Sequence, residues 1–163
     1  MTPTDDLKPL RRLLIGHGAL LLFTGGVIGF GFLFHLIGAI KLWPFPGVID
    51  FQMPGSYKAW RMSHLEALMN GSIIWLIAAL LPHLPFTVTG LRRITWGIIV
   101  TGWTLVAGSM CDALFPDSRG LAANSVLTNN IAFGLFYIGI LIVMAILALI
   151  AWRSLRPEPP SSS

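Results

Sequence analysis

The chain has 163 residues, of which 55% are hydrophobic and only 11% are charged. Soluble domains carry about 25% charged residues, so a soluble fold of this length cannot bury so much apolar surface, and lipid must solvate part of it. The net charge of +4 comes from basic residues that lie between hydrophobic blocks, which excludes nucleic acid as a partner, and the single cysteine excludes an intrachain disulfide.

Four apolar blocks follow one another along the chain, at residues 13–40, 62–81, 94–114 and 131–152. Each is close to or above the roughly 20 residues that a helix needs to cross a bilayer. The blocks lack the alternation of polar and apolar residues that a membrane-spanning strand requires. The first block is also too long for the hydrophobic part of a signal peptide. The sequence therefore predicts an all-α polytopic membrane protein, a bundle of four transmembrane helices.

We expect one membrane domain, residues 1–152, followed by a disordered tail at residues 153–163. Basic residues indicate how this domain is oriented. One side of the membrane would hold seven of them, Lys8, Arg11, Arg12, Arg92, Arg93, Arg153 and Arg156, and the other side four, Lys41, Lys58, Arg61 and Arg119. The positive-inside rule then predicts that both termini, with the tail, are cytoplasmic.

Polar side chains at membrane depth are costly to bury, so they point either to function or to helix packing. The blocks contain His17, His35, His64, Glu66, Asn70, Thr101, Thr104, Ser109, Asp112 and Tyr137. In the expected topology, His35 and His64 could share one membrane depth, and His17 could share another with His83.

The second block has the densest polar cluster. His64 and Gly71 are seven residues apart and lie nearly on one helical face, whereas Glu66 and Asn70 are four apart and share another. A histidine with a glycine two turns further on offers a ligand above a flat surface that could accept a planar ring, and imidazole is a usual ligand of haem iron. The residues alone leave three alternatives open at His64: a haem or metal site, a site for a hydrophobic substrate, or a hydrogen bond to a neighbouring helix.

Small residues recur at helical spacing in two other blocks. Gly25 and Gly29 form a GxxxG pattern, and Thr101, Thr104 and Gly108 form a stripe. Both patterns favour close packing between helices over chemistry.

A longer motif spans the second block and the segment before it, Pro54-Gly55-Ser56-x-x-Ala59-Trp60-x-x-Ser63-His64, followed by Asn70-Gly71. Shorter motifs keep the same order, namely Gly16-His17-Gly18, Pro46-Gly47-x-Ile49-x-Phe51, Gly102-Trp103 and Arg119-Gly120-Leu121. Together these motifs resemble the bacterial styrene oxide isomerase family. The fourth block is similar in character only.

The resemblance implies an integral protein of the bacterial inner membrane that forms a homotrimer and binds haem b between neighbouring subunits. Its partners would be membrane lipid and a hydrophobic aryl epoxide. The haem b-dependent isomerase converts that epoxide to a carbonyl compound: iron acts as a Lewis acid on the epoxide oxygen, the C–O bond opens, and a 1,2-hydride shift follows.

The resemblance also assigns roles to individual residues. His64 stands at the position of the axial haem ligand. Asn70 stands at that of a polar residue facing the substrate, where we expect it to position the epoxide oxygen. Thr101 stands where the family has an aspartate, and Ser109 stands where the family has a tyrosine that holds the epoxide. Both are therefore candidate catalytic residues at altered positions.

Glu66 has no counterpart in the resemblance and could simply pair with Arg61 or Arg119. Two alternative functions accompany the isomerase. The chain could be a small structural or accessory membrane protein with no cofactor, or a haem-binding membrane protein for electron transfer or sensing, without isomerase activity. A second axial histidine, such as His35 at the depth of His64, would favour that function because six-coordinate iron has no open site.

Overall fold

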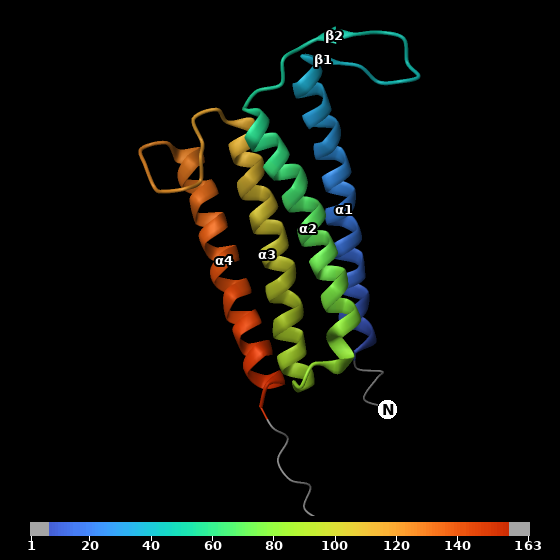
Figure 1. Cartoon of the computed structure of the whole chain (residues 1–163), viewed down its shortest axis with the longest axis vertical. Coiled ribbons are helices and arrows are strands. Elements are labelled where there is room, and N and C mark those ends of the chain that lie inside the picture. Colours follow the sequence, from blue (N-terminus) through green and yellow to red (C-terminus); the bar gives the residue numbers. More distant parts are fainter. Residues whose placement is uncertain (1–6, 157–163) are drawn as a thin grey trace, which may run out of the picture.

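Four long helices stand side by side as an antiparallel bundle in the computed structural model, which describes residues 7–156 (Figure 1). They are α1 (Lys8–Ile37), α2 (Tyr57–Leu80), α3 (Val88–Leu114) and α4 (Leu127–Ser154). Within that range, β1 (Ala39–Ile40) and β2 (Ile49–Asp50) pair as a short antiparallel hairpin, and a 3-10 turn, η1 (Leu81–His83), follows α2. All four helices are long and apolar enough to cross a membrane, which confirms the predicted four-helix membrane fold.

The helices extend beyond the apolar blocks, so the expected boundaries were too narrow at every N-terminal end. The starts expected at residues 13, 62, 94 and 131 lie instead at residues 8, 57, 88 and 127. Hydropathy marks the stretch that crosses hydrocarbon, whereas a helix continues until its end is capped. Two of the cap residues are polar: Ser56 Oγ accepts a hydrogen bond from Ala59 N, and Thr87 Oγ1 accepts one from Gly90 N.

The C-terminal ends differ less from expectation. The first helix ends at Ile37 rather than at residue 40, because Gly38 takes a left-handed conformation with φ of 68°. The last helix continues to Ser154, so Arg153 belongs to it and not to the tail. The rest of the predicted tail, from residue 157, lies outside the described residues.

Both ends of the described chain lie at one end of the bundle, which we call the terminal end (Figure 1). The hairpin lies at the other end, which we call the hairpin end. All seven basic residues that the sequence assigned to one side of the membrane lie near the terminal end, at the start of α1, the start of α3 and the end of α4.

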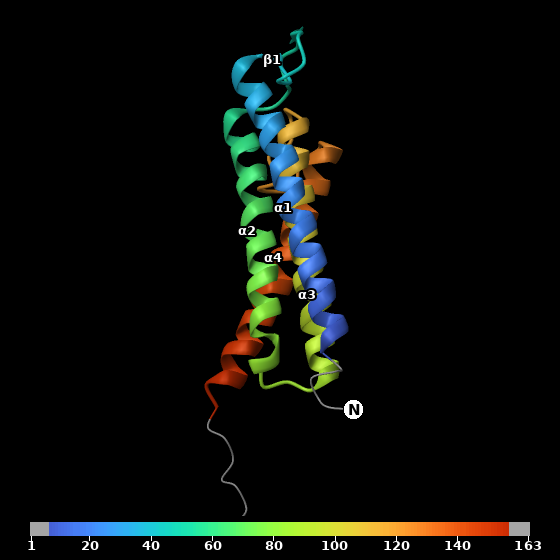
Figure 2. The same cartoon turned by 90° about the vertical axis from the view of Figure 1, so that its right-hand side faces the viewer.

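The helices pack in chain order, α1 on α2, α2 on α3 and α3 on α4 (Figures 1 and 2). Helix α4 uses a single stripe for this contact, in which the buried residues are Asn129, Ala132, Gly139 and Ile146. The remaining surface of α4 is apolar and exposed, and one side of α3 stays open between α2 and α4.

The small-residue patterns are packing contacts, as the sequence predicted. A Cβ atom on Gly25 would lie 2.9 Å from Leu68 Cδ2, so this glycine allows α1 and α2 to approach closely. Between α3 and α4, Thr101 Oγ1 donates a hydrogen bond to Gly139 O at 3.3 Å, and a Cβ atom on Gly108 would lie 3.3 Å from Ala132 O.

Candidate functional site

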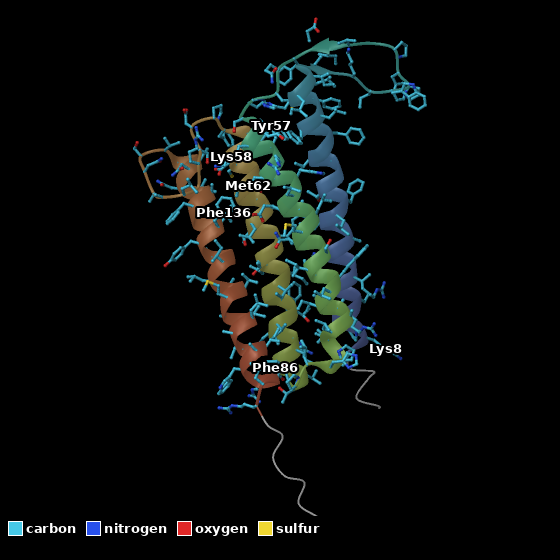
Figure 3. All side chains as sticks on the ribbon, viewed as in Figure 1. Lys8, Tyr57, Lys58, Met62, Phe86 and Phe136 are labelled. Carbon is cyan, nitrogen blue, oxygen red and sulfur yellow. The ribbon has the colours of Figure 1, made fainter. Side chains whose placement is uncertain are left out.

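Two adjoining cavities form one hollow between α2, α3 and α4, in the part of the bundle nearer the hairpin end. Their volumes are about 480 and 500 Å³, and Lys58, Met62, Glu66 and Leu105 line both of them. Figure 3 shows Lys58 and Met62 of α2 and Phe136 of α4 in the half of the bundle nearer the hairpin end. The lining is largely apolar, with a few polar side chains, which is the usual character of a site for a small hydrophobic ligand.

Glu66 and Asn70 form a hydrogen-bonded pair inside this hollow. Asn70 is only 8% exposed, and its Nδ2 donates to the backbone oxygen of Glu66 at 2.9 Å and to Glu66 Oε2 at 3.0 Å. The sequence placed these two residues on one helical face, and that prediction is confirmed. The carboxylate of Glu66 therefore has Asn70 as its partner, where the sequence had suggested Arg61 or Arg119.

The other two candidate catalytic residues, Thr101 and Ser109, lie in different surroundings. Thr101 lines the same cavity as Glu66 and Asn70. Ser109 is 1% exposed and lines neither cavity, because its Oγ donates to Val106 O and its backbone oxygen accepts from Ser63 Oγ at 2.7 Å. The structure thus brings Asn70 and Thr101 together and leaves Ser109 in the contact between α2 and α3.

The connection from α3 to α4 forms the far wall of the hollow. Asn129 holds it in place, since its Oδ1 accepts from the backbone nitrogens of Arg119 and Gly120 at 2.9 and 3.0 Å. Asp112 accepts a 2.6 Å hydrogen bond from Ser118 Oγ beside the same cavity.

Three aromatic side chains of α4, Phe133, Phe136 and Tyr137, complete that wall. Sequence analysis named Tyr137 among the polar side chains at membrane depth but assigned no role to the two phenylalanines, because the fourth block is otherwise apolar. The sequence did contain a signal for them: Phe136 and Tyr137 follow Phe133 by three and four residues, which places all three on one face of a helix.

His64 lies on the other side of α2, against α1. Its Nδ1 makes a 2.8 Å hydrogen bond with the backbone oxygen of Gly25. A Cβ atom on Gly29 would lie only 3.0 Å from His64 Cε1, so the ring fits there because residue 29 is a glycine. The sequence had assigned Gly25 and Gly29 to packing alone, and their contact with His64 was missed.

The hydrogen bond to Gly25 fixes the tautomer of the neutral His64 ring. A carbonyl oxygen can only accept, so in the neutral ring Nδ1 carries the hydrogen and Nε2 keeps a lone pair. Among the described residues, His64 Nε2 has no hydrogen-bond partner. A neutral imidazole held in this way by a backbone carbonyl is the usual arrangement of a metal-binding histidine.

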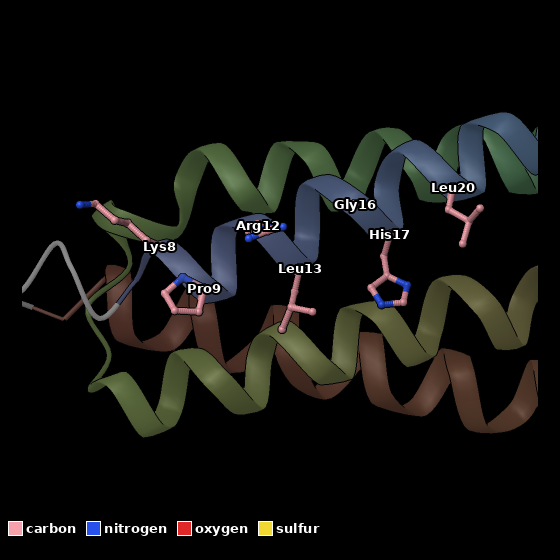
Figure 4. A pocket seen from close by; sticks show the side chains of 7 residues that line it. All are labelled: Lys8, Pro9, Arg12, Leu13, Gly16, His17 and Leu20. Atoms are coloured by element: carbon pink, nitrogen blue, oxygen red, sulfur yellow. The ribbon is translucent and has the colours of Figure 1, made fainter.

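His17 has the opposite arrangement. Its Nδ1 accepts a 3.1 Å hydrogen bond from Trp103 Nε1, so in the neutral ring the hydrogen lies on Nε2. His17 borders an open groove of about 740 Å³ along α1, where its side chain and that of Leu13 point toward α3 (Figure 4). The groove is larger than either cavity of the hollow taken alone, but its histidine lacks a free lone pair, so His64 is the better candidate ligand.

The two expected pairs of histidines at equal depth are wrong. His64 contacts Gly25 and Gly29, whereas His35 is at least six residues further along α1, about 9 Å at the rise of an α-helix. His35 instead contacts Met53 O at 3.1 Å, in the segment between β2 and α2. His17 is next to Gly18, which packs on Trp75, and His83 lies eight residues beyond Trp75.

The flat surface expected at Gly71 is also absent. A Cβ atom there would lie 2.8 Å from Leu22 Cγ and 3.0 Å from Gly18 O, so α1 covers this glycine. A planar group bound at His64 therefore cannot lie over Gly71.

The described residues contain no group of three or more His, Cys, Asp or Glu side chains that could hold a metal ion. A porphyrin supplies four of the iron ligands itself, so one histidine is enough for haem. The geometry of His64 fits this requirement.

Comparisons with known proteins match nearly the whole chain. The sequence model of a family described as styrene oxide isomerase matches residues 10–155. A styrene-oxide isomerase of Pseudomonas fluorescens is 28% identical over 157 residues, which cover 92% of this chain and 91% of that protein.

Proposed function

Because the chain belongs to the styrene oxide isomerase family and is an epoxide isomerase of the membrane, we propose that it uses haem b, held by His64, to convert a hydrophobic aryl epoxide to a carbonyl compound. The observation that carries this proposal is the hydrogen bond between His64 Nδ1 and Gly25 O. It leaves His64 Nε2 as the donor atom for iron. Haem iron bound there would supply a Lewis acid for the epoxide oxygen.

Arg61 suits the other requirement of haem, a partner for its carboxylates. It is exposed and lies three residues before His64 on α2, so the two side chains are neighbours on the helix surface. It is also one turn closer to the hairpin end. In this position its guanidinium can pair with a haem propionate near the membrane surface.

A second copy of the chain is needed to bring the haem ligand and the hollow together. His64 and Glu66 are two residues apart on a helix, so their side chains point in directions about 200° apart. His64 faces α1, whereas Glu66 faces the hollow on the side of α3 and α4. A haem held by His64 of one copy can border the hollow of the next, which supports the homotrimer with a site between subunits.

The membrane location follows from the same arrangement. The end of the bundle with seven basic residues faces the cytoplasm of a bacterial inner membrane, with both termini on that side. The hollow opens between α2 and α4, and α4 is exposed to lipid along most of its length. A hydrophobic epoxide dissolved in the bilayer has direct access to it.

The direct test uses the detergent-purified protein. We expect a Soret band with about one haem b per chain by pyridine haemochrome assay, and formation of phenylacetaldehyde from styrene oxide in the haem-loaded protein. Absence of aldehyde from a panel of aryl epoxides, with haem bound, would favour the electron-transfer or sensing function.

Replacement of Gly29 by alanine is expected to weaken haem binding about tenfold. The added Cβ atom would lie 3.0 Å from His64 Cε1 and displace the ring from Gly25 O. The rate of haem transfer to apomyoglobin measures this effect. Gly16→Ala is the matched control, because its Cβ position on the same helix is open. Equal transfer rates from the two variants would contradict the assigned position of the ring.

A further inference from the structure

The Glu66–Asn70 pair presents only hydrogen-bond acceptors to the hollow. An asparagine amide nitrogen carries two hydrogens, and here one is donated to the backbone oxygen of Glu66 and the other to Glu66 Oε2. In the described part of the chain, neither Asn70 Oδ1 nor Glu66 Oε1 accepts a hydrogen bond. These two oxygens are therefore available to a ligand.

An acceptor-only surface does not match the oxygen of an epoxide, which is itself an acceptor. Both amide hydrogens of Asn70 are engaged by Glu66 in this structure, so the free oxygens of the pair offer acceptors and not donors to the hollow. Carboxylate and carbonyl oxygens attract positive charge instead.

Other charges of the hollow lie closer to its rim. Arg61 is five residues before Glu66 on α2, about 7.5 Å nearer the hairpin end, and Lys58 lies further in the same direction. Asp112 and Arg119 lie in the second cavity, where Asp112 already accepts from Ser118. Glu66 is the deepest charged residue of the described lining.

From Glu66 toward the terminal end, the lining of the hollow is mostly apolar, with Met69, Ile73, Ile98 and Val143. Water is displaced from such a surface by a hydrophobic ligand, and the field of a carboxylate is stronger in a medium of low dielectric constant. The two free oxygens of Glu66 and Asn70 can therefore attract a positively charged atom of a ligand whose apolar part lies against this wall.

We propose that Glu66, with Asn70, forms a cation-binding subsite in the hollow, selective for a positive centre attached to an aromatic ring. In the reaction assigned above, on which this part rests, that centre is the ring-bearing carbon of the epoxide. Its bond to oxygen breaks and the electron pair leaves with the oxygen, so the carbon becomes electron-deficient.

The reaction balances without a change at Glu66. The neighbouring carbon transfers hydrogen with its electron pair to the electron-deficient carbon, and an oxygen electron pair forms the C=O bond. No proton enters or leaves. Glu66 and Asn70 oxygens stabilise the positive charge while it exists, which acts on the transition state and not on the bound epoxide.

The first test needs no turnover. Benzyltrimethylammonium carries a fixed positive charge beside an aromatic ring, cannot ligate iron, and has neopentylbenzene as a neutral analogue of the same shape. Titration calorimetry of the haem-loaded protein in lipid nanodiscs should give at least about tenfold tighter binding of the cation. Glu66→Gln, which can still accept from Asn70 Nδ2, should abolish this preference, and Asp112→Asn should keep it.

The second test is kinetic. Glu66→Gln should lower kcat for styrene oxide by roughly tenfold to a hundredfold with KM almost unchanged, as for loss of a group that acts only in the transition state. The loss should be larger for epoxides with electron-withdrawing ring substituents. Asp50→Asn, which removes an exposed carboxylate of β2 outside the hollow, should keep kcat within about twofold.

The two tests separate the subsite from the reaction. A cation preference that depends on Glu66, in a protein that forms no aldehyde, would support the subsite and contradict the isomerase reaction. Normal aldehyde formation by Glu66→Gln, with equal binding of the cation and its neutral analogue, would overturn the subsite and leave the reaction standing.

Discussion

Replacement of His64 by alanine is expected to remove the Soret band and aldehyde formation together. His64 Nε2 is the proposed donor atom for iron. His17 is not equivalent, since its Nδ1 accepts from Trp103, and His35 lies in the last turn of α1 with its ring stacked on Trp60. Haem content by pyridine haemochrome assay should fall at least about tenfold relative to the wild type. Circular dichroism should report an unchanged helix content, because the ring makes one hydrogen bond, to Gly25 O, and is partly exposed.

Two further measurements make this result specific. His17→Ala, which removes a histidine of the same bundle, should retain haem. Imidazole added to His64→Ala enters the space left by the ring, and recovery of the Soret band would assign the loss to the missing ligand and not to misfolding. Full haem content in His64→Ala would exclude this residue as the ligand.

Two inactive variants should restore activity to each other when they are expressed together. His64→Ala lacks the haem ligand but keeps its hollow. Met62→Trp keeps His64 but fills part of both cavities, since Met62 lines each of them. In the proposed oligomer, each site combines the haem ligand of one copy with the hollow of the next copy around the ring. A ring that contains both variants then has one site in which an intact His64 meets an intact hollow.

The fraction of activity that is recovered also indicates the number of subunits in the oligomer. With a different affinity tag on each variant, purification through both tags selects mixed assemblies. A mixed ring of three has one intact pairing in three, so we expect about one third of the wild-type activity, against about one half for a dimer. Activity no greater than that of each variant alone would place the ligand and the hollow in one chain, in contradiction to their positions on opposite sides of α2.

The sequence predicted the bundle because hydropathy and length alone define a membrane helix. It also singled out His64 and the pair of Glu66 and Asn70, whose spacing on a helix is independent of tertiary structure. The positions of the helix starts required polar capping residues, such as Ser56.

Relations between helices were harder to predict. Depth was estimated by counting residues from each helix end, and this placed His35 level with His64, whereas their actual contacts, Met53 and Gly25, lie at different heights. The direction of Gly71 depends on where α1 crosses α2, which no spacing within one helix reveals. The role of Asn70 depends on which of its atoms Glu66 engages, and only the side-chain geometry defines that.

Helix α4 contacts the rest of the chain along one stripe of four buried residues, and the rest of its surface is apolar. Lipid tails and another protein helix are nearly equivalent neighbours for such a surface, so no hydrophobic force drives copies together. Association through this surface is a competition between lipid and protein contacts. Its extent follows the ratio of protein to lipid in the bilayer, and dilution with lipid, rather than with water, dissociates the copies.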